Sequence, residues 1–302
     1  MGALLRAWFT LSVPEAVPPS RPRATGHLEA TRSRETAADR VAHLESMVVL
    51  PRHRALQLGG RVKTEHSHEL ARRDTDYWWF RSRYRLVHRL LSDACAVPLP
   101  DGLLDFGCGA GGFLKFAEAS GLCGRDRMIG LDADSGSIDL VRKAGFQAMV
   151  ADADALSGIH LPTAPSAISM LDVLEHLQDP VEALVQLRRI GKPGTVLVCV
   201  VPALQGLWSE WDERLGHQRR YTTRTLRGHL TMAGWKPVSL QYMFPSMVLP
   251  ALARRWAGVT GGADEFPAVP QWVDRALGGW TAMENRFRHW PFGTSVAALA
   301  IA

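Results

Sequence analysis

The feature that most constrains this chain is a glycine-rich loop between an apolar run and a predicted helix, Asp105-Phe-Gly107-Cys-Gly109-Ala-Gly111-Gly112. Glycines let the backbone turn tightly there and let a ligand lie against it, beside the positive end of the helix. Gly107, Gly109 and Gly112 match the spacing GxGxxG. With Gly111 as the third glycine, the loop equally matches DxGxGxG. The loop therefore predicts a site for a nucleotide-type cofactor, with a structural tight turn as the alternative.

Apolar runs alternate with helical segments beyond residue 100. The runs that we expect to form strands are 102–106, 128–132, 146–152, 167–173, 195–201, 235–242 and 295–302. Strands separated by helices predict an α/β fold in which helices cover both faces of a mostly parallel sheet. An earlier helix within 76–91 places Trp78, Tyr84 (or Arg85) and Leu91 near one of its faces.

The positive charge of the chain is concentrated at its start. Residues 1–75 hold 12 Arg and Lys against 8 Asp and Glu, whereas the formal charge of all 302 residues is +5. The segment 14–40 is rich in Pro, Arg, Ser, Thr and Ala, which is typical of disordered tails. We therefore expect residues 1–75 to be disordered, or to precede the true start of translation (Met47 is a candidate), and one domain to occupy 76–302.

The cysteines and the hydropathy pattern indicate a cytoplasmic protein. The four cysteines form no CxxC pair, which argues against a disulfide framework or a structural zinc module. The sequence contains no run of about 18 apolar residues, so it predicts no membrane-spanning helix. The first residues also lack the continuous apolar core of a signal peptide.

Three acidic residues argue against a nicotinamide dinucleotide as the cofactor of this loop. Asp105 stands two residues before the first glycine, where a carboxylate suits an ammonium group. Asp132 ends the second predicted strand and can accept both hydroxyls of a ribose, while Asp152 ends the third and can accept from an adenine amino group. A nicotinamide pyrophosphate gains nothing from an anion at Asp105, and no Tyr-x-x-x-Lys pair is present.

The motifs LLDFGCGAGG, IGLDAD, VADADAL, MLDVLEHLQDP and GKPG occur in that order. Together they resemble the class I S-adenosylmethionine-dependent methyltransferases of the type 11/23 group. The resemblance covers residues 76–302 and includes the WWFR (78–81) and GHQRRYT (216–222) segments of a bacterial subgroup. It implies a Rossmann-like seven-stranded sheet whose last strand is antiparallel.

The resemblance also implies roles for individual residues. Asp105, Gly107, Gly109 and Gly111 would hold the methionine part of S-adenosylmethionine. Asp132 would hold the ribose, and Asp152 with Ala153 the adenine. Asp172 and Arg83 are expected beside the same cofactor, Arg83 either neutralising its carboxylate or remaining a solvated helix charge. The chain departs from the family pattern at Gly194-Thr195, where a second glycine is usual, and in its long N-terminal extension.

Asp172, Glu175 and His176 follow the fourth predicted strand and should face the side of the methyl group. Three interpretations stay open. In the first, the residues cap the next helix and close the pocket; in the second, His176 acts as a general base. Alternatively, Asp172, Glu175 and His176, with His217 as a further ligand, hold Mg²⁺ or a similar ion, although no metal is the preferred expectation.

The segments 203–221 and 243–294 are expected to form an insertion and a cap on the acceptor side. His217 and Tyr221 could orient or deprotonate an acceptor. Arg219 and Arg220 could bind an anionic group on it, or pair with nearby carboxylates. The apolar segment 242–255 fits a buried cap better than a membrane-surface helix.

The sequence thus predicts a methyltransferase that acts on a small-molecule acceptor, lipidic or anionic in character, at an oxygen atom. His176, His217 and Tyr221 are the candidate catalytic residues. The expected partners are that acceptor and at most a weak peripheral membrane contact, with no nucleic acid. No feature specifies an oligomeric state. The alternatives are a nicotinamide-dependent oxidoreductase and a non-catalytic RNA-binding adaptor.

Overall fold

The computed structural model describes residues 77–302 except 160, 162 and 257–268. Its core is a seven-stranded sheet in the order β3-β2-β1-β4-β5-β7-β6. The strands are β1 (Leu103–Phe106), β2 (Met128–Asp132), β3 (Gln147–Val150), β4 (Ala167–Leu171), β5 (Val196–Pro202), β6 (Lys236–Met243) and β7 (Ser295–Ile301). The expectations for residues 1–75 lie outside the described residues.

The last strand runs against its neighbours. β1, β2, β3, β4 and β5 pair in parallel, whereas β7 is antiparallel to both β5 and β6. This is the mostly parallel, Rossmann-like sheet that the sequence predicted. The carboxyl ends of the parallel strands therefore meet at one edge of the sheet, where ligands bind in open α/β folds.

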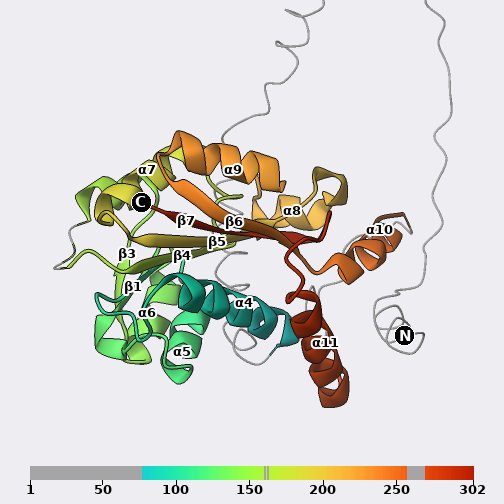
Figure 1. Cartoon of the computed structure of the whole chain (residues 1–302), viewed down its shortest axis with the longest axis horizontal. Coiled ribbons are helices and arrows are strands. Elements are labelled where there is room, and N and C mark those ends of the chain that lie inside the picture. Colours follow the sequence, from blue (N-terminus) through green and yellow to red (C-terminus); the bar gives the residue numbers. More distant parts are fainter. Residues whose placement is uncertain (1–76, 160, 162, 257–268) are drawn as a thin grey trace, which may run out of the picture.

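Helices cover both faces of the sheet (Figure 1). The helices α4 (Trp78–Ala94), α5 (Gly112–Ala119) and α6 (Ser135–Lys143) lie on one face. The helices α7 (Pro180–Ile190) and α9 (Thr223–Met232) lie on the other. Strand β5 contributes to both layers, because Val196, Val198 and Val200 pack in the first core and Leu197, Cys199 and Val201 in the second. Burial on both faces explains its continuous apolar run.

The remaining elements gather toward one end of the sheet (Figure 1). They are α8 (Glu210–Leu215), α10 (Val248–Trp256) and α11 (Gln271–Glu284). Short 3₁₀ turns occur at Arg125–Arg127, directly before β2, and at Asp154–Gly158, Gln205–Leu207 and Pro245–Met247. Helix α11 packs on α4, where the Arg81 side chain pairs with Asp274 and the Ser82 hydroxyl lies 2.6 Å from that of Thr281. Among the described residues, no helix is both long and apolar enough to span a bilayer.

Helix α4 buries a charged side chain that the sequence pattern did not place on the face of Trp78, Tyr84 and Leu91. Trp78, Tyr84 and Leu91 are buried as expected, and Arg85 is exposed. Arg83 is also buried, at 6% exposure, because its guanidinium finds a carboxylate partner inside the fold. The helix thus carries a positive charge into the end of the sheet where β4 and β5 finish.

Candidate active site

The glycine loop follows β1 and leads into α5 as the sequence predicted. Gly107, Gly109 and Gly111 all have left-handed backbone conformations, with φ of +74°, +51° and +81°. A Cβ atom at Gly107 would collide with the Val173 side chain. A Cβ atom at Gly109 would meet no described atom within 4 Å. Gly107 is therefore required by packing, whereas Gly109 borders open space in which a cofactor can lie against the backbone.

Asp132 at the end of β2 is tied to this loop. One of its carboxylate oxygens accepts the Gly109 N–H at 2.8 Å, and the other accepts the Asp134 N–H at 2.9 Å. Burial raises the pKa of Asp132, although these backbone donors act in the opposite direction. A carboxylate can accept about four hydrogen bonds, so both oxygens keep capacity for the hydroxyls of a ribose. The position fits the sugar-binding role that the resemblance implies.

The other acidic residues of the expected cofactor site differ in exposure. Asp105 is only 3% exposed, and the Ser169 hydroxyl donates to its carboxylate at 2.6 Å. Asp152 is exposed and Ala153 is partly buried, just beyond β3. The roles of Asp105 toward an ammonium group and of Asp152 with Ala153 toward adenine stay predictions.

Arg83 and Asp172 form an ion pair at the end of β4. Arg83 binds both carboxylate oxygens of Asp172, with 2.7 Å between Nη2 and Oδ1, and Nη2 also donates to the Ser295 hydroxyl at 3.3 Å. Asp172 has a left-handed φ of +56°, which ends β4 two residues before the predicted strand end at 173. Such strain in a residue other than glycine is typical of functional sites. The predicted cofactor roles of both residues stay predictions.

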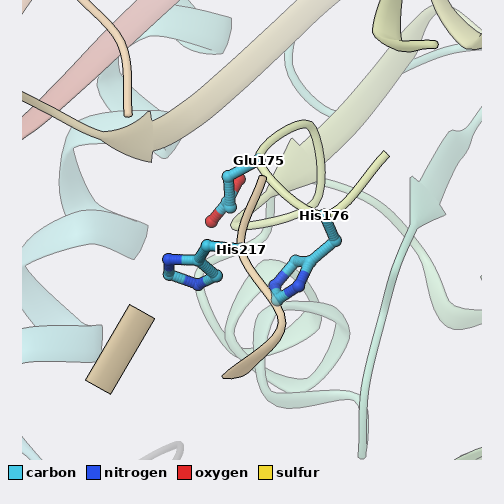
Figure 2. Close-up of side chains that lie close together, drawn as sticks. All are labelled: Glu175, His176 and His217. Carbon is cyan, nitrogen blue, oxygen red and sulfur yellow. The ribbon is translucent and has the colours of Figure 1, made fainter. Parts of the chain in front are cut away.

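Glu175, His176 and His217 lie together (Figure 2). The charges of Asp172 and Arg83 act on Glu175. One candidate ligand atom from each residue falls within 4.8 Å of the other two, and the two imidazole rings meet edge to face with centroids 4.7 Å apart. The loop between β4 and α7 supplies Glu175 and His176, and the segment between α8 and α9 supplies His217. A hydrogen bond of 2.7 Å from the Gln218 N–H to the Glu175 carbonyl joins the two segments.

Glu175 is fully buried, and neither of its carboxylate oxygens has a hydrogen-bond partner among the described residues. Burial and the nearby charge of Asp172 raise its pKa well above the ordinary value. An uncompensated buried carboxylate is costly, so such a group marks a site at which a proton, a cation or a ligand is held.

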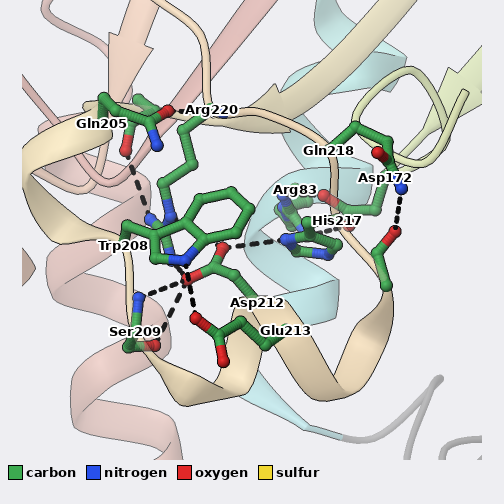
Figure 3. Close-up of polar contacts among 12 residues, drawn as sticks. Arg83, Asp172, Gln205, Trp208, Ser209, Asp212, Glu213, His217, Gln218 and Arg220 are labelled. Atoms are coloured by element: carbon green, nitrogen blue, oxygen red, sulfur yellow. Dashed lines mark hydrogen bonds and ion pairs between the residues drawn. The ribbon is translucent and has the colours of Figure 1, made fainter. Parts of the chain in front are cut away.

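His217 is held from behind by Asp212 (Figure 3). Its Nδ1 lies 2.8 Å from Oδ1 of Asp212, which is fully buried on α8. Arg220 donates to both oxygens of the same carboxylate at 2.8 and 2.9 Å, and the Ser209 N–H donates at 2.9 Å. Although burial by itself raises the pKa of Asp212, the hydrogen bonds from His217 and Arg220 outweigh it and hold the pKa far below its ordinary value. Nδ1 of His217 therefore carries a hydrogen atom and donates a hydrogen bond to the ionised carboxylate of Asp212.

The other predicted residues of the GHQRRYT segment have partners inside the protein. Tyr221 is 1% exposed, and its hydroxyl donates to the Leu174 carbonyl at 3.2 Å. Burial raises its pKa far above the ordinary value, so its position favours packing, and a catalytic role stays a prediction. Arg220 pairs with Asp212, and Arg219 donates to the Gln178 carbonyl at 3.0 Å. For Arg220 the geometry matches the expected pairing with a nearby carboxylate.

Sequence reasoning missed the part that Asp212 plays. It treated the nearby carboxylates only as partners for the arginines, whereas the fold places one of them, Asp212, directly behind His217. The signal was the spacing of five residues across a short helix that ends at Gly216, whose left-handed φ of +74° turns the chain back. It also missed the stacking of Trp79 on Phe244, with ring centroids 4.3 Å apart, and of Arg83 over Trp79 at 5.3 Å.

Comparison with known proteins identifies the family. A family model described as a methyltransferase domain matches residues 68–240, which is more than half of the chain. No curated protein sequence matches the chain. Among solved structures, the methyltransferase in complex with the Trm112 methyltransferase activator of Haloferax volcanii shares 18% identity and a TM-score of 0.53, covering 81% of this chain and 96% of that one.

Two further solved structures have lower TM-scores. A SAM-dependent methyltransferase from Archaeoglobus fulgidus shares 20% identity with a TM-score of 0.45, covering 72% of this chain and 94% of that one. The N-methyltransferase NodS of Bradyrhizobium japonicum, solved with S-adenosylhomocysteine, shares 15% identity with a TM-score of 0.44, covering 76% of this chain and 90% of that one.

One expectation from the sequence needs correction. The expected partners were a small-molecule acceptor and at most a peripheral membrane contact, with no nucleic acid. The Haloferax volcanii methyltransferase, which has the same fold, is in complex with a protein activator. The restriction to a small-molecule partner was therefore wrong.

The family match also decides between the cofactors that the glycine loop left open. Open space at Gly109 and the spare acceptor capacity of Asp132 fit S-adenosylmethionine, which is the cofactor. The nicotinamide alternative has no support from the family match. The chain belongs to the methyltransferase domain family of class I, S-adenosylmethionine-dependent enzymes.

Proposed function

We propose that this methyltransferase acts on an acceptor hydroxyl held at Glu175, His176 and His217, and that it works in the cytoplasm. The main observation is the cluster of a buried Glu175 and two partly buried histidines beside the strained end of β4, the strand next to the one that leads into the glycine loop. The four cysteines, all free thiols, support a reducing compartment.

The proposed chemistry divides between the cofactor and the chain. Bound S-adenosylmethionine supplies an electrophilic methyl group. The acceptor oxygen would form its bond to that carbon as the S–C bond breaks, and the electron pair of the broken bond would stay on sulfur. The cluster of Glu175, His176 and His217 promotes loss of the hydroxyl proton. A hydroxyl is a weak nucleophile until its proton is removed, so this arrangement supports oxygen as the acceptor atom.

The surrounding residues position the reaction and exclude water. Asp212 fixes the orientation of the His217 ring, and Arg220 fixes Asp212 in turn. Trp79 and Phe244 stack at the same end of the sheet, beneath Arg83. Polar groups that are already fixed in place need no reorganisation during the reaction, which supports a catalytic role for this region.

Replacing His217 tests the proposal. His217→Ala should lower methyl transfer by about 10²-fold or more, because it removes a proton-handling group from the cluster. The S-adenosylhomocysteine affinity should stay near that of the wild type, since Asp132 and the glycine loop are untouched. His88→Gln, at a half-buried histidine of α4 whose ring packs against Phe116, is the matched control.

The assay uses S-adenosylmethionine with a tritiated methyl group and a cell lysate separated into RNA, protein, lipid and small-molecule fractions. Mass spectrometry of the labelled product then identifies the methylated atom. Equal transfer by His217→Ala and wild type, or label found only on nitrogen or carbon, would contradict the proposal.

A further inference from the structure

The cluster of Glu175, His176 and His217 has the donor set of a metal centre. Two imidazoles and one carboxylate suit divalent ions of the first transition series, and the same set leaves coordination positions open. Ligand atoms about 2.1 Å from one ion are about 3 to 4 Å apart. The candidate ligand atoms of this cluster lie within 4.8 Å of one another, so side-chain movements of about 1 Å would bring them to coordinating distances.

Glu175 supplies the second, independent observation. Its side chain is fully buried in the cluster, and both carboxylate oxygens lack a hydrogen-bond partner among the described residues. The arginines whose charges act on it are already engaged, Arg83 by Asp172 and Arg220 by Asp212. A cation between Glu175 and the two histidines would satisfy the carboxylate that the rest of the fold leaves unpaired.

The residues behind His217 hold its ring as metal-binding histidines are usually held. A histidine that binds a metal through one ring nitrogen usually donates its other N–H to a carboxylate. Here Nδ1 of His217 donates to Asp212 at 2.8 Å, which leaves Nε2 as the nitrogen with a free lone pair. Arg220 and the Ser209 N–H hold Asp212 in place (Figure 3). The ring is therefore fixed in one tautomer and one orientation before any ion binds.

We infer that Glu175, His176 and His217 bind one divalent transition-metal ion, of the series from Mn²⁺ to Zn²⁺, with Asp212 as the positioning residue behind His217. The inference rests on the proposed function, and it names how the acceptor hydroxyl is activated. The acceptor oxygen occupies an open position on the ion, which lowers the pKa of the hydroxyl, so its proton is lost to solvent before the methyl group is transferred. Asp172 is not a ligand, because Arg83 binds both of its oxygens.

Co²⁺ is the probe, because its visible absorption reports coordination by protein ligands. The untagged full chain is treated with a chelator, dialysed and titrated with Co²⁺, with calorimetry in parallel. The chain has 11 histidines, so the decisive quantity is the difference between wild type and variant. We expect one equivalent in the wild type and in His88→Gln, and loss of that equivalent in Glu175→Gln and in His217→Ala. S-adenosylhomocysteine binding verifies that each variant is folded, and His176→Ala replaces a variant that is not.

An absorption spectrum and stoichiometry that are the same in wild type, Glu175→Gln and His217→Ala would overturn the inference, as would no binding at all. Methyl transfer separates this failure from failure of the proposed function. Full activity in chelator-treated wild type, together with inactive His217→Ala, would reject the metal ion and leave the cluster as a direct proton acceptor. Activity lost on chelation and restored by Mn²⁺ or Zn²⁺ would support the ion.

Discussion

Asp132 is the residue that connects the glycine loop with the expected position of the cofactor sugar. Its two oxygens already accept N–H groups from Gly109 and Asp134, so the carboxylate is fixed before a ligand arrives. Hydrogen bonds to a charged group contribute about 1.5 to 3 kcal/mol each. At the scale of one residue, the affinity for S-adenosylmethionine should therefore depend strongly on this side chain.

Replacing Asp132 should reveal that dependence. Asp132→Ala is expected to weaken S-adenosylhomocysteine binding by about 10²-fold, because two charge-assisted hydrogen bonds to the ribose are lost. Isothermal titration calorimetry measures the change, and Asp126→Ala, at an exposed aspartate before β2, is the matched control. An affinity equal to that of the wild type would show that the ribose lies elsewhere.

The raised pKa of Asp132 predicts a pH dependence with a definite sign. Burial raises this pKa above the ordinary aspartate value, so the carboxylate takes up a proton at a higher pH than usual. S-adenosylhomocysteine affinity should fall as the pH is lowered through the raised pKa, because the protonated group accepts fewer hydrogen bonds. In the free protein the folded state binds this proton more tightly than the unfolded state. Asp132 should therefore reduce stability as the pH rises from the ordinary value through the raised one. Titrations from neutral pH down to the lowest pH at which the protein stays folded test the affinity, and an affinity that does not change over that whole range would contradict the assignment.

At the scale of elements, two glycines of the same loop serve different purposes: Gly107 is needed for packing, and Gly109 for binding the cofactor. Gly107→Ala should lower the melting temperature by several degrees, because it adds a collision with Val173 to a strained φ that costs about 1 to 2 kcal/mol. Gly109→Ala carries a similar strain but meets open space, so its main effect should be weaker cofactor binding. Thermal unfolding of the free proteins and calorimetry with S-adenosylhomocysteine distinguish the two. Equal effects of both variants on stability and on affinity would contradict this account.

Helices and strands could be predicted from the sequence where a single physical cause, such as burial of an apolar run, determines them. The segments 128–132 and 295–302 form strands as predicted, because their apolar runs are buried in the sheet. The strand predicted over 167–173 ends at Leu171, since Asp172 takes a left-handed conformation to reach Arg83. That pairing depends on how α4 packs across the sheet, and no local pattern encodes it.

The candidate site could be predicted only in part, because some of its contacts also depend on tertiary packing. The motif around Glu175 and His176 is local, so its place after a strand could be predicted. The contact of His217 with Asp212, and the lack of partners for the Glu175 carboxylate, arise only when α8 folds back over the end of β5. The family resemblance supplied the fold and the cofactor, and the tertiary structure supplied the cluster.

At the scale of the whole molecule, the sheet places cofactor and acceptor sites at one edge. Strands β1 and β2 end at the glycine loop and at Asp132, and the neighbouring strand β4 ends directly before Asp172. The segments after β5 and β6 add α8 and α10 at the same end of the sheet (Figure 1). The order of the strands alone therefore brings the expected methyl donor next to the cluster of Glu175, His176 and His217.

A crystal structure with S-adenosylhomocysteine tests this central claim most directly. We predict that the ribose hydroxyls lie within hydrogen-bond distance of Asp132, that the chain of the ligand passes along Gly109, and that its sulfur faces Glu175, His176 and His217. A ligand bound with its sulfur directed away from these three residues, or bound elsewhere on the sheet, would contradict the account.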